Sequence, residues 1–433
     1  MAGSKPAATS IFDVNLRTGT VALMLVVLLA TTIMAPPATQ AQTFSVIHYF
    51  TGGGDGANPG ARLILDSGGS LYGGTELGGN SSEYCAPTCG TVFKISHARS
   101  GWAFTPLYLF HGTDGSSPTA INFGPDGILY GTAGYLFNLE PPASACKSAI
   151  CYWTETVLYD GCCVFYAGPL IFDGEGNLYG TSAEGGIVNR CSGGLGCGFV
   201  YEMTPSDEDY WNESNLFIFN SGSAHPSGGV IFDQSGNLYG TTAGLYGGDG
   251  FGSVFELTPS GSGWTENTLY QFTSQFGTPG SFPTAGVILD AAGNFYGATT
   301  TGGSGGGGTV FELTHPGSGW SYNLLYSFTG SGYLPGVHQS LIMDAAGNLY
   351  GTTYYDGAYN EGSVFKLTPS GGNWTYTSLH DFTGGSDGAN PDAGLILDSN
   401  GNLYGTTLAG GHTGANCASY LSYQCGVVFE ITP

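Results

Sequence analysis

The sequence predicts an all-β fold, a seven-bladed β-propeller of four-stranded antiparallel blades. Three observations predict it. The phrase GNLYGTT recurs seven times with small changes, each copy lies among short runs of strand type, and the two ends of the chain resemble two strands of one blade. A phrase that repeats at a regular period is typical of repeat architectures.

The repeat is about 54 residues long, as the tyrosine of the recurring phrase shows. This tyrosine falls at Tyr72, Tyr130, Tyr179, Tyr239, Tyr296, Tyr350 and Tyr404. An apolar run ending in Asp precedes it, as in LILD at 395–398, and two runs follow it, as in TVFEL at 309–313 and WSYNLLYSF at 320–328. Such runs, bounded by Gly, Pro, Asp or Ser, are typical of strands. D-x-x-G-N turns join the first two strands and TPSGSGW-like loops join the last two, so each repeat is a four-stranded meander.

Both faces of the early strands are apolar, which favours a propeller. Leu403 and Tyr404 must point to opposite sides of their strand, so a single meander would expose hydrophobic side chains to water. Radial repetition of the sheets buries both faces. The alternative repeat fold, a β-helix, is usually built from shorter coils.

The two ends of the chain are expected to close the ring. FSVIHYF at 44–50 matches the fourth strand of the repeat, and GVVFEITP at 426–433 matches the third. An N-terminal outer strand would therefore complete the last blade, which leaves no long free sheet edge. Six blades are then continuous in sequence, and the seventh is shared by both ends.

Residues 1–41 are expected to be a secretory signal peptide, and residues 42–433 a single propeller domain. Residues 21–34 form an uncharged run of 14 residues, whereas a helix that spans a bilayer needs about 20. An uncleaved signal anchor is the alternative. Cleavage after Ala41 predicts a secreted or periplasmic protein with no membrane contact.

The charge of the chain excludes one class of partner. The formal net charge is −24, and residues 42–433 keep six Lys and Arg residues against 31 acids. Such a chain repels phosphate backbones, so no nucleic-acid partner is expected. We expect a monomer that carries no cofactor.

Ten cysteines in an exported chain indicate disulfides rather than free thiols. Their spacing predicts four local pairs: Cys85–Cys89, Cys146–Cys151, Cys191–Cys197 and Cys417–Cys425. The adjacent Cys162 and Cys163 have no predicted pairing. No CxxC pair is matched by a second pair or by histidines, so no metal site is expected.

The repeat unit GNLYGTT…GTVFELTP…W…LY.F…DG..P.AGLILD resembles the GloVer tandem repeat of bacterial exported proteins. The resemblance covers essentially all of residues 42–433. It implies an exported repeat protein, and it implies no activity and no site residue.

One face of the predicted propeller collects the loops of variable length, and binding loops are typically the variable ones on a rigid scaffold. Three neighbouring blade-linking loops on this face carry Asp-Gly, with Asp55, Asp114 and Asp387. Loops nearby are rich in tyrosine: Tyr84, Tyr354, Tyr355, Tyr359, Tyr420 and Tyr423. Asp-Gly can also simply shape a turn, and loop tyrosines can also pack on their own loops, so both interpretations stay open.

The sequence favours a non-catalytic binding module that binds an unknown extracellular glycan or protein through these loops of blades six, seven and one. Aromatic rings beside carboxylates suit either partner. The alternative is a carbohydrate-active hydrolase or lyase with a carboxylate pair on the same face. The sequence contains no GxSxG, no HExxH and no phosphate-binding loop followed by Lys, so no catalytic residue is assigned.

Overall fold

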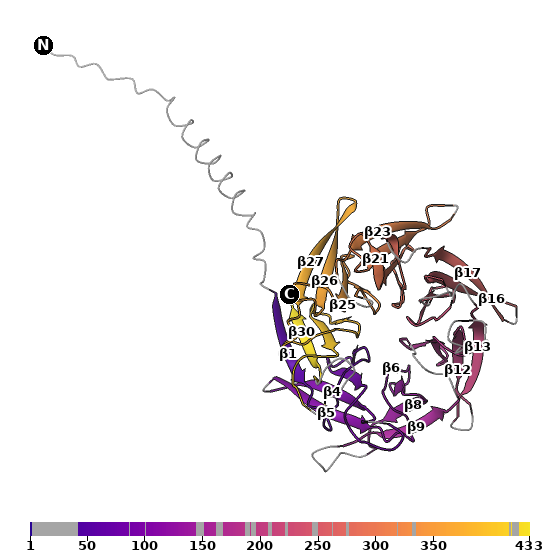
Figure 1. Ribbon diagram of the computed structural model, residues 1–433, viewed down its shortest axis with the longest axis vertical. Helices are drawn as coiled ribbons and strands as arrows, with labels where there is room; N and C mark the ends of the chain where they lie inside the picture. The colour runs from indigo at the N-terminus through magenta and orange to yellow at the C-terminus, as the bar shows by residue number, and fades with distance from the viewer. Residues whose placement is uncertain are drawn as a thin grey trace. The chain divides into compact units, whose positions relative to one another are not determined.

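Seven four-stranded antiparallel sheets form a ring within residues 43–432 (Figure 1). The predicted all-β, seven-bladed fold is therefore confirmed. The computed structural model describes residues 1, 42–85, 87–99, 101–143, 151–161, 168–186, 191, 196–206, 210–220, 224–244, 250–261, 263–273, 277–317, 319–330, 335–414, 417 and 424–433. Apart from Met1, the predicted signal peptide lies outside these residues.

Each blade runs from a short inner strand near the ring centre to a long outer strand (Figure 1). The strands of blades 1 to 3 are β2 (Ile64–Leu65), β3 (Leu71–Thr75), β4 (Thr91–Ala98) and β5 (Gly101–Leu109); β6 (Ala120–Phe123), β7 (Leu129–Thr132), β8 (Leu136–Glu140) and β9 (Thr154–Tyr159); and β10 (Ile171–Phe172), β11 (Leu178–Ser182), β12 (Phe199–Thr204) and β13 (Asn212–Ile218). Those of blades 4 to 6 are β14 (Val230–Phe232), β15 (Leu238–Thr242), β16 (Ser253–Ser260) and β17 (Gly263–Gln271); β19 (Ile288–Leu289), β20 (Phe295–Thr299), β22 (Thr309–Thr314) and β23 (Ser321–Ser327); and β24 (Ile342–Met343), β25 (Leu349–Thr353), β26 (Ser363–Ser370) and β27 (Asn373–Asp381). A small extra sheet pairs β18 (Gly277–Ser281) with β21 (Thr301–Gly303).

Blade 7 combines strands from both ends of the described chain. It contains β28 (Ile396–Leu397), β29 (Leu403–Thr407) and β30 (Val427–Thr432), and its fourth strand is β1 (Thr43–Tyr49). β1 pairs antiparallel with β30, with Phe44 opposite Ile431 and Tyr49 opposite Val427.

The recurring Tyr-Gly pair explains how a blade packs on its neighbour. Tyr239 of β15 contacts Phe295 of blade 5, with ring centroids 4.6 Å apart. The next residue, Gly240, lies opposite Phe255 of its own blade. A Cβ added at Gly240 would lie 2.7 Å from the Phe255 ring, so only glycine leaves room for that ring. Tyrosine therefore joins adjacent blades, and glycine admits the aromatic side chain of the third strand.

The turn between the first two strands is held by its aspartate. Asp290 Oδ1 accepts hydrogen bonds from the backbone N–H groups of Ala292 and Asn294, both at 2.8 Å. Asp290 Oδ2 accepts one from the Asn294 side chain at 2.9 Å and lies 3.2 Å from the Tyr296 hydroxyl. The same contacts recur at Asp173, Asp233, Asp344 and Asp398. This aspartate is thus part of the scaffold.

The last two strands of a blade are joined more tightly than the sequence suggested. The TPSGSGW-like segments were expected to be loops, but in blades 1, 4 and 6 the strands continue through them. In blade 6 the pairing reaches Ser370 and Asn373, and only Gly371 and Gly372 form the turn. Both glycines have positive φ, at 58° and 86°, as a two-residue hairpin turn matched to strand twist requires.

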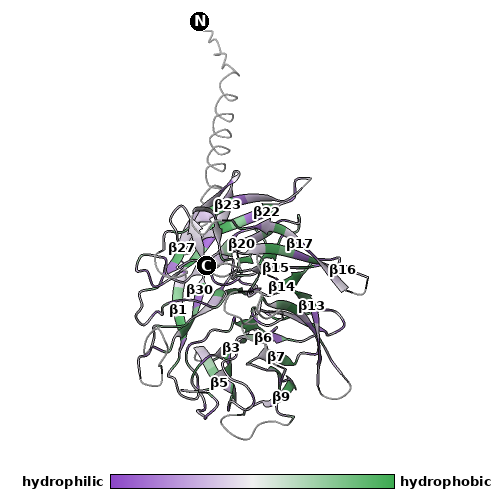
Figure 2. Ribbon diagram, turned by 45° about the vertical axis from the view of Figure 1, so that its right-hand side comes forward, coloured by the Kyte–Doolittle hydropathy of each residue, from purple (hydrophilic) through white to green (hydrophobic). Residues whose placement is uncertain are grey.

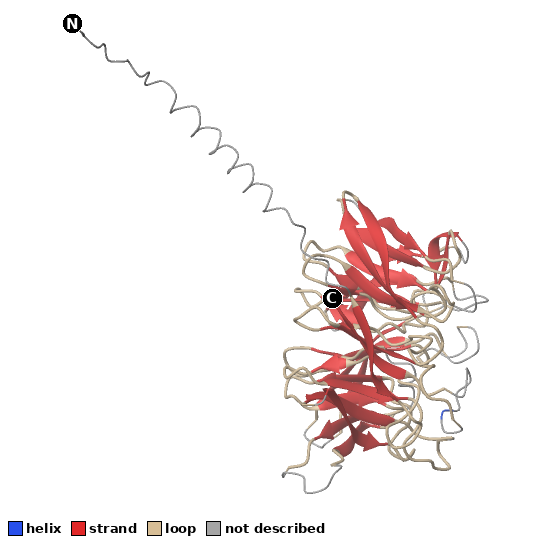
Figure 3. Cartoon of the chain, turned by 90° about the vertical axis from the view of Figure 1, so that its left-hand side faces the viewer, coloured by secondary structure: helices blue, strands red, loops and turns tan. Residues whose placement is uncertain are grey.

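Hydrophobic residues lie along the strands, as on β17 and β22 (Figure 2), and the connecting loops gather on two faces of the ring (Figure 3). Three disulfides secure the long loops of one face: Cys85–Cys89, Cys191–Cys197 and Cys417–Cys425. These are three of the four expected pairs. Cys151 is also in a disulfide, whereas Cys146, Cys162 and Cys163 lie outside the described residues.

Candidate functional site

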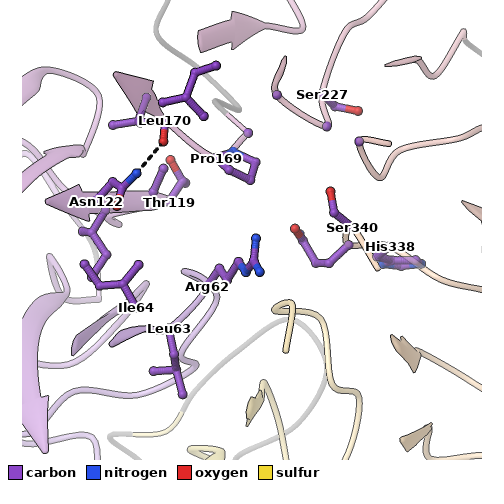
Figure 4. A pocket seen from close by; sticks show the side chains of 18 of the residues that line it. Arg62, Leu63, Ile64, Thr119, Asn122, Pro169, Leu170, Ser227, His338 and Ser340 are labelled. Carbon is purple, nitrogen blue, oxygen red and sulfur yellow. Dashed lines mark hydrogen bonds between the residues drawn. The ribbon is translucent and has the colours of Figure 1, made fainter. Parts of the chain in front are cut away.

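A cavity of about 650 Å³ occupies the centre of the ring. Every blade contributes to its wall through the residues around its first strand. Figure 4 shows Leu170, Pro169, Arg62, His338 and Ser340 around this space. Most of the wall is apolar or uncharged, and its titratable groups are Arg62, Glu76, His338 and Asp392. All four come from blades 1, 6 and 7 or from the loops that lead into them.

The polar side chains around the cavity also link neighbouring blades. The Ser227 hydroxyl donates a hydrogen bond to the Thr284 carbonyl oxygen at 3.2 Å. The Thr284 hydroxyl in turn donates one to the His338 carbonyl oxygen at 3.3 Å. His338 Nδ1 then lies 2.6 Å from Asp392 Oδ1. Blades 4 to 7 are therefore connected side by side at the cavity wall, and His338 and Asp392 are held in place by the scaffold.

Glu76 and Asp392 form the acidic part of the wall. The Glu76 carboxylate lies against Gly60, where an added Cβ would be 2.5 Å from Oε1. No described residue donates a hydrogen bond to this carboxylate. Burial, with a smaller contribution from the negative charge of Asp392, raises the pKa of Glu76 to about 7. A carboxyl group with such a pKa is poised to exchange a proton near neutral pH.

Two of the predicted tyrosines pack behind His338 and do not line the cavity themselves. Tyr354 stacks on the His338 ring, with centroids 4.7 Å apart and planes within 8°. Tyr355 contacts Tyr354 edge to face at 4.5 Å. Tyr354 is buried, with 8% of its surface exposed. It therefore supports the histidine from behind and presents little surface to a ligand.

The three Asp-Gly carboxylates each bind within their own loop. Asp55 accepts a hydrogen bond from the Thr51 amide at 3.0 Å, and Asp387 accepts one from the Thr383 amide at 2.9 Å. Asp114 accepts one from the His111 amide at 2.7 Å. Each also lies beside one histidine: His48, His111 or His380. None of the three aspartates lines the central cavity, and the described contacts join none of them to another.

The remaining predicted tyrosines lie elsewhere. Tyr84 and Tyr359 are exposed on their loops, at 66% and 60%, and do not line the cavity. Tyr420 and Tyr423 lie outside the described residues. Of the nine predicted binding residues, the structure thus brings Tyr354 and Tyr355 together behind His338, and none of the described ones lines the cavity.

Among the described residues, no group of three or more His, Cys, Asp or Glu side chains is arranged to hold a metal ion. Within the same part of the chain, no helix is long and apolar enough to cross a membrane.

The model of the Gloeobacter/Verrucomicrobia repeat family matches residues 165–420. The chain belongs to this family. The match covers blades 3 to 6 and the first two strands of blade 7, and blades 1 and 2 repeat the same turn and Tyr-Gly contacts with small variations. A comparison with curated proteins found no match.

Solved structures with a similar chain trace share little sequence with this member of the Gloeobacter/Verrucomicrobia repeat family. The WD40 β-propeller domain of Doa1 has a TM-score of 0.49 at 11% identity, over 89% of this chain and 96% of that chain. A putative oxidoreductase (glucose dehydrogenase) from Thermus thermophilus has a TM-score of 0.44 at 14% identity, over 90% of this chain and 100% of that chain. A Trichoderma reesei carbohydrate-active enzyme of family AA12 has a TM-score of 0.43 at 13% identity, over 92% of this chain and 97% of that chain. Identities this low indicate no shared function.

Sequence reasoning missed the four titratable residues of the cavity wall. A signal was nevertheless present, since the family repeat reads P-T-A-G-V-I-L-D at residues 283–290, P-D-A-G-L-I-L-D at 391–398 and P-G-A-R-L-I-L-D at 59–66. Arg62 replaces the glycine of the other two repeats, and Asp392 stands at a position that differs in each of the three; both lie shortly before an inner strand. Departures from a repeat at ring-centre positions would have been a better guide than the Asp-Gly turns.

Proposed function

We propose that this protein is an exported, non-catalytic binding module that binds a glycan in the central cavity, on the side formed by blades 6, 7 and 1. The observation that carries the proposal is the one-sided placement of Glu76, His338 and Asp392, together with Arg62, in a cavity whose remaining wall is uncharged. Ligand sites are typically concave, between about 300 and 1,000 Å³, and mostly apolar with a few converging polar groups. Carboxylate and imidazole groups are suitable partners for sugar hydroxyls.

A glycan array, followed by calorimetric titration of the best ligand, tests the proposal. His338→Ala and Asp392→Asn should each weaken binding about 10-fold or more, because each removes a polar contact to the ligand. Tyr359→Ala is the matched control: this tyrosine follows the same strand of blade 6 as Tyr354, but it is exposed and does not line the cavity. Its affinity should equal that of the wild type.

Two results would contradict the proposal. Absence of binding to every glycan on the array would remove the sugar ligand. Weaker binding by Tyr359→Ala or Tyr84→Ala, with His338→Ala and Asp392→Asn unaffected, would move the site to the outer loops.

A hydrolase or lyase is the second candidate, and the pKa of Glu76 favours it. Glycosidases pair a carboxylic acid that keeps its proton near neutral pH with a nearby carboxylate. Glu76, with a pKa of about 7, and Asp392, whose charge acts on it, are the matching pair here.

An activity assay on a panel of polysaccharides tests this second candidate. It measures the release of reducing ends or of unsaturated uronic acids. Glu76→Gln should lower any such activity by a factor of about 100 or more, since a general acid cannot be replaced by an amide. A wild type that binds a polysaccharide without cleaving it would leave binding as the function.

A further inference from the structure

Arg62 breaks a ring of small residues at the centre of the propeller. It lies four positions before the first turn residue of blade 1 and lines the cavity. The corresponding residues of blades 2 to 7 are Ala120, Pro169, Gly229, Gly286, Ser340 and Gly394. Six small residues leave the space that forms the cavity, and one long cationic side chain extends from blade 1 toward its middle (Figure 4).

The surroundings of Arg62 leave most of its hydrogen-bonding capacity unused. Nη2 donates one hydrogen bond, to the Leu395 carbonyl oxygen at 3.1 Å. Nε is buried and has no hydrogen-bond partner among the described residues. The side-chain stem packs on Gly394, where an added Cβ would lie 3.3 Å from Cδ of Arg62. A guanidinium has five N–H donors arranged as a planar fork, so this one can still bind an acceptor from the cavity.

The positive charge of Arg62 is not cancelled by the carboxylates of the cavity wall. No ion pair joins Arg62 to a carboxylate in the described part of the chain. Asp392 is hydrogen-bonded to His338 instead, at 2.6 Å. Glu76, whose pKa burial raises to about 7, is mostly protonated below neutral pH. The cavity therefore holds one permanent cation that forms no ion pair with any described carboxylate.

The burial of Arg62 lowers the stability of the folded protein, because a buried charge is destabilising unless it is paired. It is also unexpected in a chain with only eight Lys and Arg residues against 32 Asp and Glu. An anionic group of the ligand would complete the pair. A planar carboxylate accepts two parallel hydrogen bonds from a guanidinium, which gives both affinity and orientation.

We propose that the ligand of the central cavity is an acidic glycan, and that Arg62 binds the carboxylate of one of its uronic-acid units. This inference rests on the proposed glycan-binding function and specifies the class of glycan. The remaining polar groups of the wall, His338, Asp392 and Glu76, then face the hydroxyl groups of the same ligand.

The inference is tested with two forms of the same oligosaccharide. One is a short oligogalacturonide, and the other is its fully methyl-esterified form, in which the ester removes the negative charge. Calorimetric titration of the wild type should show about 10- to 100-fold tighter binding of the acid, the range expected for charged hydrogen bonds. Arg62→Met keeps most of the stem and should abolish this preference. Arg62→Lys keeps the charge without the fork and should retain part of it. Thermal unfolding of each variant shows that it is folded.

The outcomes separate the inference from the proposed function. Equal binding of acid and ester by the wild type, or an unchanged preference in Arg62→Met, would overturn the role of Arg62 and leave glycan binding in place. Preference for a sulfated oligosaccharide over the uronate would overturn the uronic-acid assignment. Absence of binding to any sugar, neutral or acidic, would overturn both.

Discussion

Carboxylates in this propeller fall into two groups whose surroundings shift their pKa values in opposite directions. Burial alone would raise the pKa of Asp290, but its hydrogen bonds to the turn hold that pKa below its ordinary value. Glu76 is buried with no such donors among the described residues, so its pKa rises to about 7. The first group stabilises the fold when ionised, and Glu76 destabilises it when ionised.

The Glu76→Gln variant should be more stable than the wild type at alkaline pH. The pKa of Glu76 in the folded state lies above its value in the unfolded state. Glu76 therefore does not destabilise the protein below about pH 4.5, and the free energy of unfolding falls as the pH rises through 7. The glutamine side chain has nearly the same shape as Glu76 but carries no charge. We expect a gain of about 2 to 3 kcal/mol in the free energy of unfolding at pH 8, and almost none at pH 4.5.

Urea denaturation at the two pH values measures this gain, and Glu83→Gln provides the control. Glu83 follows the same strand of blade 1 but is exposed, so its variant should behave like the wild type at both pH values. An equal gain at pH 4.5 and pH 8 in Glu76→Gln would show that ionisation of Glu76 is not the cause.

At the scale of the strand, side-chain size is matched across neighbouring strands. Each second strand places a glycine opposite the central aromatic residue of the third, as Gly240 opposite Phe255 and Gly351 opposite Phe365. The aromatic ring lies across the glycine and fills the volume that a side chain would take. The pairing of glycine with an aromatic residue in the repeat therefore reflects one packing unit.

Gly240→Ala should destabilise the protein, whereas Gly263→Ala in the same blade should not. An added Cβ at Gly240 would lie 2.7 Å from the Phe255 ring and 2.9 Å from the Gly229 carbonyl oxygen, and at Gly263 it would meet nothing within 4 Å. Overpacking of this kind costs about 1 to 3 kcal/mol. Chemical denaturation compares the two variants, and equal stability would contradict the packing role of Gly240.

At the scale of the whole molecule, the pairing of β1 with β30 places residues from both ends of the described chain in one sheet. Phe44 of β1 stacks on His380 of blade 6 at 3.7 Å and on Phe429 of β30 at 5.7 Å. β1 therefore contributes backbone hydrogen bonds within blade 7 and side-chain packing between blades 6 and 7. Its loss would leave β30 as a free sheet edge.

Phe44→Ala should lower the melting temperature clearly more than Tyr49→Ala. Removal of a partly buried phenylalanine costs about 2 to 4 kcal/mol, whereas Tyr49, in the same strand, is 39% exposed. Deletion of residues 43–49 should be more damaging than either substitution. A deletion variant that unfolds at the wild-type temperature would show that β1 does not close the ring in solution.

Much of the fold was predictable from the sequence because every blade repeats the same local signals. The turn aspartate, the Tyr-Gly pair and the aromatic residue of the third strand recur from blade to blade, and each acts within one blade or on its neighbour. The spacing of Cys191 and Cys197 likewise indicated a bond within one loop. The length of the last two strands was underestimated, because Gly-Gly segments suggest a loop as readily as a two-residue hairpin turn.

The candidate site depended on contacts that no local pattern contains. Asp55, Asp114 and Asp387 attracted attention as a recurring motif, yet each carboxylate binds backbone amides of its own turn. Arg62 and Asp392 are more than 300 residues apart and meet around one cavity only because the ring brings the first and last blades together. By itself, the sequence determined the blade, its repetition and the local disulfides, since these arise from neighbouring residues. The tertiary structure alone decided which polar groups share the central cavity, because that depends on how the ring arranges all seven blades.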